Sequence, residues 1–260
     1  MNQKHISILM YHQIDKKPPK GSFLRGLVVS PATFSRHMAA LHAIGYRGMS
    51  MSDLEPYLRG EKRGNVFGIT FDDGYKNNLQ FALSILKRYR FTSTCYVVAD
   101  HVGDWNRWDS DKGMSQVPLM TADDLRAWVE AGQEIGSHTL THPNFKELDE
   151  SRQEHEILQS KRLLEKLISQ PQGVRHFCYP YGSFCQSSVR YVQAAGYATA
   201  TTTVRGRAIS PTHREDMFLL PRVLVSRTTT WMQLLLKCLT RYEDRRGIDA
   251  RGSPLDSPRA

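Results

Sequence analysis

The sequence reads Ile69-Thr70-Phe71-Asp72-Asp73-Gly74 where an apolar run that begins at Val66 ends in two adjacent carboxylates. The run predicts a buried β-strand over residues 66–71, because it is short, continuous and bounded by a turn signal. Gly74 frees the backbone to turn, so both carboxylates can reach one pocket. Two neighbouring carboxylates repel each other, and ionising both at neutral pH is costly without a cation. The stretch therefore indicates a metal or catalytic site at a strand end, with a solvated Asp-Asp-Gly turn as the alternative.

Strand-like and helix-like segments alternate on both sides of this stretch. Apolar runs predict strands, which we place at residues 6–11, 66–71, 92–99, 133–137, 174–179, 197–202 and 223–226. Helical spacing of apolar residues predicts helices at 31–44, 78–89, 121–131, 187–195 and 231–239, with a long charged helix opening at Asp149. The sequence has no Gly-rich phosphate loop, which favours a barrel over an open sheet. We predict an α/β fold, a (β/α) barrel of about seven parallel strands, in a single domain over residues 1–240.

Size and composition fit a globular protein that buries a full core. The chain has 260 residues, of which 40% are hydrophobic and 23% charged. It contains no run of about 18 apolar residues that could span a membrane. Residues 1–14 contain one short apolar run and no small-residue cleavage site, so no signal peptide is visible and we expect a cytoplasmic location. A periplasmic or extracellular location stays open if the sequence has been trimmed. The four cysteines are scattered, which favours reduced core residues over disulfides.

The chain is basic, with a formal net charge of +9. Nucleic acid, an anionic membrane face and an acidic glycan are three partners that could exploit this charge. Lysine and arginine form no dense block, and the cysteines lack zinc-finger spacing, so we do not expect a nucleic-acid partner. The segment 241–260 is rich in arginine, proline and serine, and we expect it to be a basic, disordered tail.

A second string follows the carboxylates and reads Gly136-Ser137-His138-Thr139-Leu140-Thr141-His142-Pro143. Two histidines four residues apart lie on one side of a helical turn, although satisfied surface histidines are commoner than metal ligands. Asp73, His138 and His142 would offer one oxygen and two nitrogens to a divalent ion. Three such ligands leave positions open for water, as in catalytic zinc sites. We therefore predict one divalent metal ion, with zinc favoured and cobalt or nickel as alternatives.

The two strings resemble the first two motifs of the polysaccharide deacetylases, the NodB-homology domain of carbohydrate esterase family four. The matching order of elements covers roughly residues 6–240. The resemblance implies that the barrel is distorted and that the protein removes an acetyl group from an N-acetylated sugar. It also implies that Asp72 is the general base and that Asp73, His138 and His142 bind the metal.

The third motif of that family, usually Arg-x-Pro-Tyr, is altered in this chain. The corresponding stretch reads Phe177-Cys178-Tyr179-Pro180-Tyr181-Gly182, so Cys178 stands where an arginine would steady the base. The backbone N–H of Tyr181 can still face the developing oxyanion, because that role needs no particular side chain. We expect Arg222 to supply the missing guanidinium, with a surface arginine at a strand start as the alternative.

The family's late Leu-x-His motif, which brings the general acid, is absent from the C-terminal half. The first predicted strand ends instead in Tyr11-His12, which resembles the permuted arrangement of the poly-β-1,6-N-acetylglucosamine deacetylases. A histidine at the C-terminal end of a barrel strand points toward the active-site face. We predict His12 as general acid, with a histidine packed at the barrel rim as the alternative. Trp105 and Trp108, in a long loop, are candidates for sugar contact or for loop packing.

The resemblance implies a metal-dependent hydrolase that acts on an N-acetylated glycan, either a polysaccharide such as an exopolysaccharide or a glycan precursor. Metal-activated water, Asp72 as base and His12 as acid would carry the reaction. Two alternatives remain: a related metal-dependent C–N hydrolase acting on a small amide, and a glycan-binding pseudoenzyme. The sequence indicates no particular sugar, linkage or oligomeric state.

Overall fold

Seven parallel strands form a closed barrel in the computed structural model, which describes residues 4–110, 113, 115–214 and 216–246. The strands follow one another around the barrel in the order β2-β12-β10-β9-β8-β7-β6, and β6 pairs with β2 to close it. These strands are β2 (Ile8–Tyr11), β6 (Val66–Phe71), β7 (Thr94–Val97), β8 (Glu134–Ser137), β9 (His176–Cys178), β10 (Thr199–Arg205) and β12 (Leu220–Leu224). The prediction of a distorted barrel with about seven parallel strands is confirmed, although the last strand begins three residues earlier than expected.

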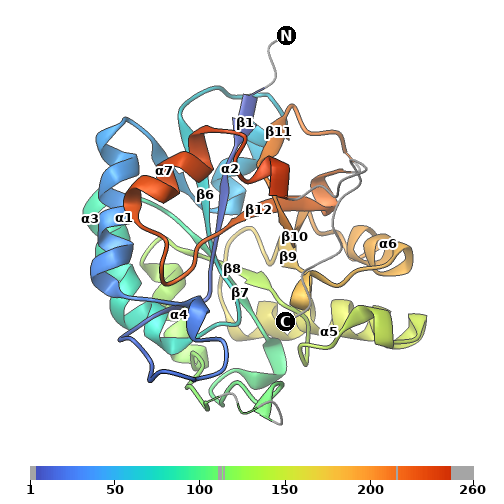
Figure 1. Cartoon of the computed structure of the whole chain (residues 1–260). Coiled ribbons are helices and arrows are strands. Elements are labelled where there is room, and N and C mark those ends of the chain that lie inside the picture. Colours follow the sequence, from blue (N-terminus) through green and yellow to red (C-terminus); the bar gives the residue numbers. More distant parts are fainter. Residues whose placement is uncertain (1–3, 111–112, 114, 215, 247–260) are drawn as a thin grey trace.

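Helices surround the barrel (Figure 1). They are α1 (Pro31–Ala43), α2 (Met51–Leu58), α3 (Leu83–Tyr89), α4 (Ala122–Glu130), α5 (Glu150–Leu167), α6 (Gln186–Ala194) and α7 (Trp231–Leu239). Local sequence fixes several of their starts. The side chain of Ser30 accepts a hydrogen bond from the Thr33 N–H at the start of α1, and Thr121 and Asp124 form a reciprocal capping box on α4. A π-helical turn, η2 (Asn78–Ala82), leads into α3.

Several short elements escaped sequence analysis. The strands β1 (Lys4–Ile6) and β11 (Ala208–Ser210) form an antiparallel pair outside the barrel, and β5 (Arg47–Met49) extends the sheet beyond β6. Their three residues each are too few to show a period. Another is α2, which contains Pro56, a residue that normally argues against a helix interior. The strands β3 (Gln13–Ile14) and β4 (Val28–Val29) form a further small sheet.

The domain continues beyond residue 240, which corrects the predicted boundary. The segment 241–246 contains the short turn η8 (Asp244–Arg246), and the side chain of Glu243 is fully buried. Arg205 on β10 pairs with Glu243 through two hydrogen bonds of 2.7 and 2.8 Å. A buried carboxylate with a paired guanidinium anchors this segment, so it is not part of a tail. Residues 247–260, the rest of the predicted tail, lie outside the described residues.

All four cysteines are free thiols, as expected. Among the described residues, the helices are each too short or too polar to cross a bilayer.

His37 on α1 ties three parts of the fold together. Its Nε2 lies 2.9 Å from the carbonyl oxygen of Thr229, and its Nδ1 lies 3.0 Å from the hydroxyl of Tyr11. A carbonyl can only accept, so Nε2 carries the proton and Nδ1 accepts from Tyr11. Burial lowers the pKa of His37 to about 4. The ring is therefore neutral in the native protein.

Acidification should destabilise the protein through His37. The unfolded chain takes up a proton at this residue near pH 6.5, whereas the native ring resists protonation until about pH 4. The free energy of unfolding should therefore fall by about 2 kcal/mol between pH 7 and 5 because of His37, and this residue should change it little at higher pH. Denaturant unfolding of the wild type and of His37→Gln at both pH values would measure it. An equal pH dependence in both proteins would contradict this assignment.

Candidate active site

The chemically active side chains meet at one end of the barrel. Asp72 and Asp73 follow β6, His138 follows β8, and His12 follows β2. Because the strands are parallel, their carboxyl ends share one face, the face that carries the active site in (β/α) barrels. The register aligns Tyr11 with Phe71, which sets the residues that follow them at the same level. The structure thus brings together the carboxylates and histidines that the sequence selected.

Asp73, His138 and His142 form a compact, buried set of potential ligands. Oδ1 of Asp73 lies 3.5 Å from Nε2 of His138 and 3.5 Å from Nε2 of His142. Ligands with bonds of 2.0–2.1 Å at tetrahedral angles lie about 3.3 Å apart, so the spacing fits one zinc-sized cation. Burial would raise the pKa of Asp73, but the two imidazoles hold it well below its usual range. Burial also lowers the pKa of His142, which favours the neutral ring that binds a metal.

The second nitrogen of His138 is fixed by the backbone. Nδ1 lies 2.8 Å from the carbonyl oxygen of Cys178, so Nδ1 carries a proton, and Nε2, next to Asp73, is the nitrogen that could bind a cation. The loop between the histidines is held by Glu156 on α5. Its carboxylate accepts hydrogen bonds from the N–H groups of Leu140 and Thr141, each at 2.9 Å. Sequence analysis missed Glu156. Its only signal was an acid next to the inward-facing Ile157.

The backbone is strained where it presents these groups. Asp73, His142 and Tyr181 have φ values of 75°, 64° and 56°, a left-handed region that is unfavourable for residues other than glycine. Such residues cost of order 1–3 kcal/mol each and persist where the surrounding structure enforces them. Gly74 continues the turn with φ 80°. The strained backbone conformation therefore occurs at residues whose side chains meet in one pocket.

Arg222 on β12 clamps Asp72. Both side chains are buried, and the two guanidinium nitrogens Nη1 and Nη2 donate to Oδ1 and Oδ2 at 2.7 Å each. Nε of Arg222 donates to the carbonyl oxygen of Thr202 at 2.8 Å, which orients the group. Nη2 also lies 3.2 Å from Sγ of Cys178, the position where the family motif carries arginine. Burial would raise the pKa of Asp72, but the charge and hydrogen bonds of Arg222 lower it below its usual range.

His12 lies beside Asp72. Its Nε2 is 3.9 Å from Oδ2 of Asp72, beyond a direct hydrogen bond. Nδ1 is buried and has no hydrogen-bond partner among the described residues. Asn78 positions the backbone of this turn by donating to the carbonyl oxygen of His12 at 2.8 Å and accepting from the N–H of Ile14 at 3.1 Å. The ring is therefore held near Asp72 with limited exposure.

Aromatic side chains pack around His142. The ring of Trp108 stacks on it with centroids 4.7 Å apart, and Tyr181 contacts it edge-on at 4.6 Å. The hydroxyl of Tyr181 donates to the buried carboxylate of Asp109 at 3.1 Å. Trp108 also contacts the ring of His101 edge-on, with centroids 5.5 Å apart, so its observed contacts are packing between two histidines. Trp105 is 42% exposed and pairs with Pro118 in an isolated bridge.

Comparisons with known proteins agree with this geometry. The family model described as polysaccharide deacetylase matches residues 59–200. YxkH of Bacillus subtilis (strain 168), provisionally named a polysaccharide deacetylase, is 28% identical over 223 residues, or 85% of this chain and 71% of that protein. A poly-beta-1,6-N-acetyl-D-glucosamine N-deacetylase of Staphylococcus epidermidis is 23% identical over 231 residues, which are 84% of this chain and 78% of that protein. The crystal structure of BC0361, a polysaccharide deacetylase from Bacillus cereus, has a TM-score of 0.76 at 26% identity and covers 91% of this chain and 69% of its own.

Proposed function

The chain belongs to the polysaccharide deacetylase family, a family of hydrolases, and from that membership we propose that it removes acetyl groups from N-acetylated sugars with one divalent cation. Asp73, His138 and His142 would hold the cation, zinc being favoured over cobalt or nickel. The observation that carries the proposal is the pair of 3.5 Å distances from Asp73 to the two imidazoles, next to a second carboxylate clamped by Arg222. Asp73 would thus serve as a ligand, while Asp72 stays ionised beside it.

When bound, a divalent cation at this position polarises the acetamide carbonyl and lowers the pKa of a water molecule. Asp72 then removes a proton from the attacking water. Arg222 keeps Asp72 ionised and in position without taking part in proton transfer. The backbone N–H of Tyr181 would donate to the oxyanion. His12, protonated, would donate to the leaving nitrogen, so that the products are acetate and a free amino sugar.

Replacing His12 by alanine should lower turnover by about 10²–10⁴-fold, the range for a lost general acid. Because a general acid acts only when it is protonated, the variant should also lack the part of the wild-type pH dependence of kcat that this role imposes. Metal content should not change, because His12 is not a ligand. A pH profile of kcat beside metal analysis would measure both. An unchanged profile would show that His12 is only a residue packed at the rim.

The extent of the substrate is suggested by a cavity near the site. The cavity, of about 330 Å³, is lined by residues that directly follow His12 in sequence, Gln13 and Asp15, and by Phe23 and Ser115 from two long loops. A cavity lined by apolar side chains and a few polar groups suits the ring of a sugar. This supports an N-acetylated oligomer or polymer over a small amide.

Acetate release from three substrate classes would test the proposal. We expect turnover of chitin oligomers or of poly-N-acetylglucosamine, and little turnover of small acylated amides. Preference for the small amides would favour the related C–N hydrolase. Binding of glycans without acetate release, in protein loaded with zinc, cobalt or nickel, would favour a glycan-binding pseudoenzyme.

A further inference from the structure

Large apolar side chains are exposed along α7 and just after it. Trp231, Met232, Leu236, Leu239 and Tyr242 are 44%, 60%, 45%, 43% and 37% exposed, and we call them the α7 surface. The other exposed large apolar residues of the described chain, Ile44, Trp105 and Ile209, lie apart from one another in sequence. Scattered apolar residues are normal on a protein surface, whereas a contiguous group indicates an interaction site.

The helix explains why these residues form one stripe. At about 100° per residue, Trp231, Met232, Leu235, Leu236 and Leu239 fall within an arc of about 140°. Leu234 and Cys238 lie outside that arc and are buried in the core. The apolar side of the helix is therefore broad, and the protein fully buries only one edge of it.

Cations border the α7 surface. Arg241, Arg245 and Arg246 follow the helix and are exposed, and Arg227 precedes it. The nearby acids are neutralised, because Glu243 is buried against Arg205 and Lys237, and Asp244 pairs with Arg207. The charge beside the stripe is therefore positive.

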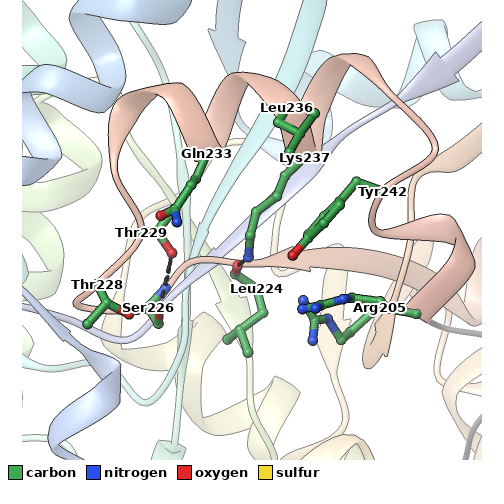
Figure 2. Close-up of a pocket in the computed structure, with 10 residues that line it drawn as sticks. Arg205, Leu224, Ser226, Thr228, Thr229, Gln233, Leu236, Lys237 and Tyr242 are labelled. Carbon is green, nitrogen blue, oxygen red and sulfur yellow. Dashed lines mark hydrogen bonds between the residues drawn. The ribbon is translucent and has the colours of Figure 1, made fainter.

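A cavity of about 360 Å³ opens along the polar flank of the same helix (Figure 2). Arg205, Lys237 and Arg246 line it together with the hydroxyl residues Ser226 and Thr228. In Figure 2 Lys237 extends from α7 toward the carbonyl of Leu224, beside the ring of Tyr242. Leu236 and Tyr242 belong both to this lining and to the α7 surface. Cationic and hydroxyl groups thus adjoin apolar ones at this surface.

We propose that the α7 surface docks on a membrane that contains anionic phospholipids. The apolar stripe would enter the boundary between headgroups and acyl chains. The exposed Arg241, Arg245 and Arg246 would receive phosphate groups, since Arg205 and Lys237 in the cavity already pair with Glu243. Helices that lie in a membrane surface combine tryptophan and leucine on one face with basic residues beside it. Anionic lipid attracts basic residues that lie near its surface. A protein partner would need matching acids, whereas a bilayer meets the apolar stripe and the cations together.

Vesicle co-sedimentation tests this proposal directly. The protein should bind vesicles of phosphatidylcholine mixed with phosphatidylglycerol, bind phosphatidylcholine alone much more weakly, and lose affinity as salt rises. The double variant Met232→Glu/Leu236→Glu should weaken binding by at least about tenfold. Both positions are exposed, so the fold should survive. The matched control Ile44→Glu, at 43% exposure on α1's C-terminal side, should bind like the wild type. Binding should also shift the fluorescence of Trp231, and Trp231→Phe should remove that shift.

Deacetylation of a soluble oligomer should be the same in the wild type and in the double variant, so failure of docking and failure of the proposed function are distinguishable. Absence of vesicle binding by the wild type would overturn the proposal, as would equal losses in Ile44→Glu. If light scattering showed a dimer that the double variant dissociates, while vesicles remained unbound, the α7 surface would be a contact between copies of the chain instead.

Discussion

Replacing Asp73 by alanine should remove the bound metal and acetate release together, whereas Asp72→Asn should keep the metal and still lose turnover. The reason lies in the different contacts of the two carboxylates. Asp73 faces the imidazoles of His138 and His142, and Asp72 faces Arg222 and His12. Asparagine preserves the shape of Asp72 but cannot remove a proton, so we expect kcat to fall by about 10²–10⁴-fold. Elemental analysis and kcat for each variant measure the two effects separately.

His138→Ala should behave like Asp73→Ala, because both are in the ligand set. A suitable control is Asp123→Ala, whose carboxylate is 89% exposed on α4 and should affect neither property. Loss of metal in Asp72→Asn would contradict the assignment of the two roles. So would full turnover in that variant.

The second large effect should follow from Arg222→Met. The variant leaves the Asp72 carboxylate buried without its partner, and breaking a buried pair in this way costs about 3–5 kcal/mol of stability. The pKa of Asp72 should rise, because burial is no longer opposed by the guanidinium. The base must be ionised to act, so the acidic limb of kcat/KM should move to higher pH. Denaturant unfolding and a pH profile would measure the stability and the shift.

The sign of the stability effect can also be checked against pH. In the wild type Asp72 has a lowered pKa in the native state, so the pair stabilises the fold above the unfolded pKa and loses that contribution as the pH falls through the native pKa. In Arg222→Met the native pKa is raised instead. The variant should therefore be least stable near neutral pH and should recover stability on moderate acidification.

A second substitution offers a matched rescue. Sγ of Cys178 lies 3.2 Å from Nη2 of Arg222, so an arginine at position 178 could place its guanidinium near the vacated position. We expect Arg222→Met/Cys178→Arg to recover part of the lost stability and turnover. Cys178→Arg alone should be harmful, because it adds a second cation to a filled, buried site. If Arg222→Met were as stable and active as the wild type, the clamp would have no role.

The sequence predicted the barrel because its strands are short apolar runs that end at turn signals, as at Val66–Phe71. It also selected Asp73, His138 and His142 as candidate ligands, because residues at the carboxyl ends of parallel strands converge. Sequence alone could not establish the pairing of Arg222 with Asp72, since 150 residues separate them and only closure of the barrel brings them together. The hydrogen bonds of Glu156 and the stacking of Trp108 on His142 also depend on tertiary packing. The missed strands β1 and β11 are likewise defined by a partner distant in sequence.

The role of segment 241–246 was misjudged for a related reason. Its composition is charged and suggests a solvated tail, but Glu243 finds Arg205 and Lys237 within the fold. Composition predicts order poorly where a few specific ion pairs, rather than apolar burial, anchor a segment.

The most direct test of the account is to measure metal content and acetate release on the same protein through chelation and metal add-back. We predict that activity on an N-acetylated oligosaccharide disappears when the metal is stripped and returns in proportion to divalent ion bound, saturating at one ion per chain. Asp73→Ala should not recover at any metal concentration that restores the wild type. Undiminished acetate release from metal-free protein would contradict the account.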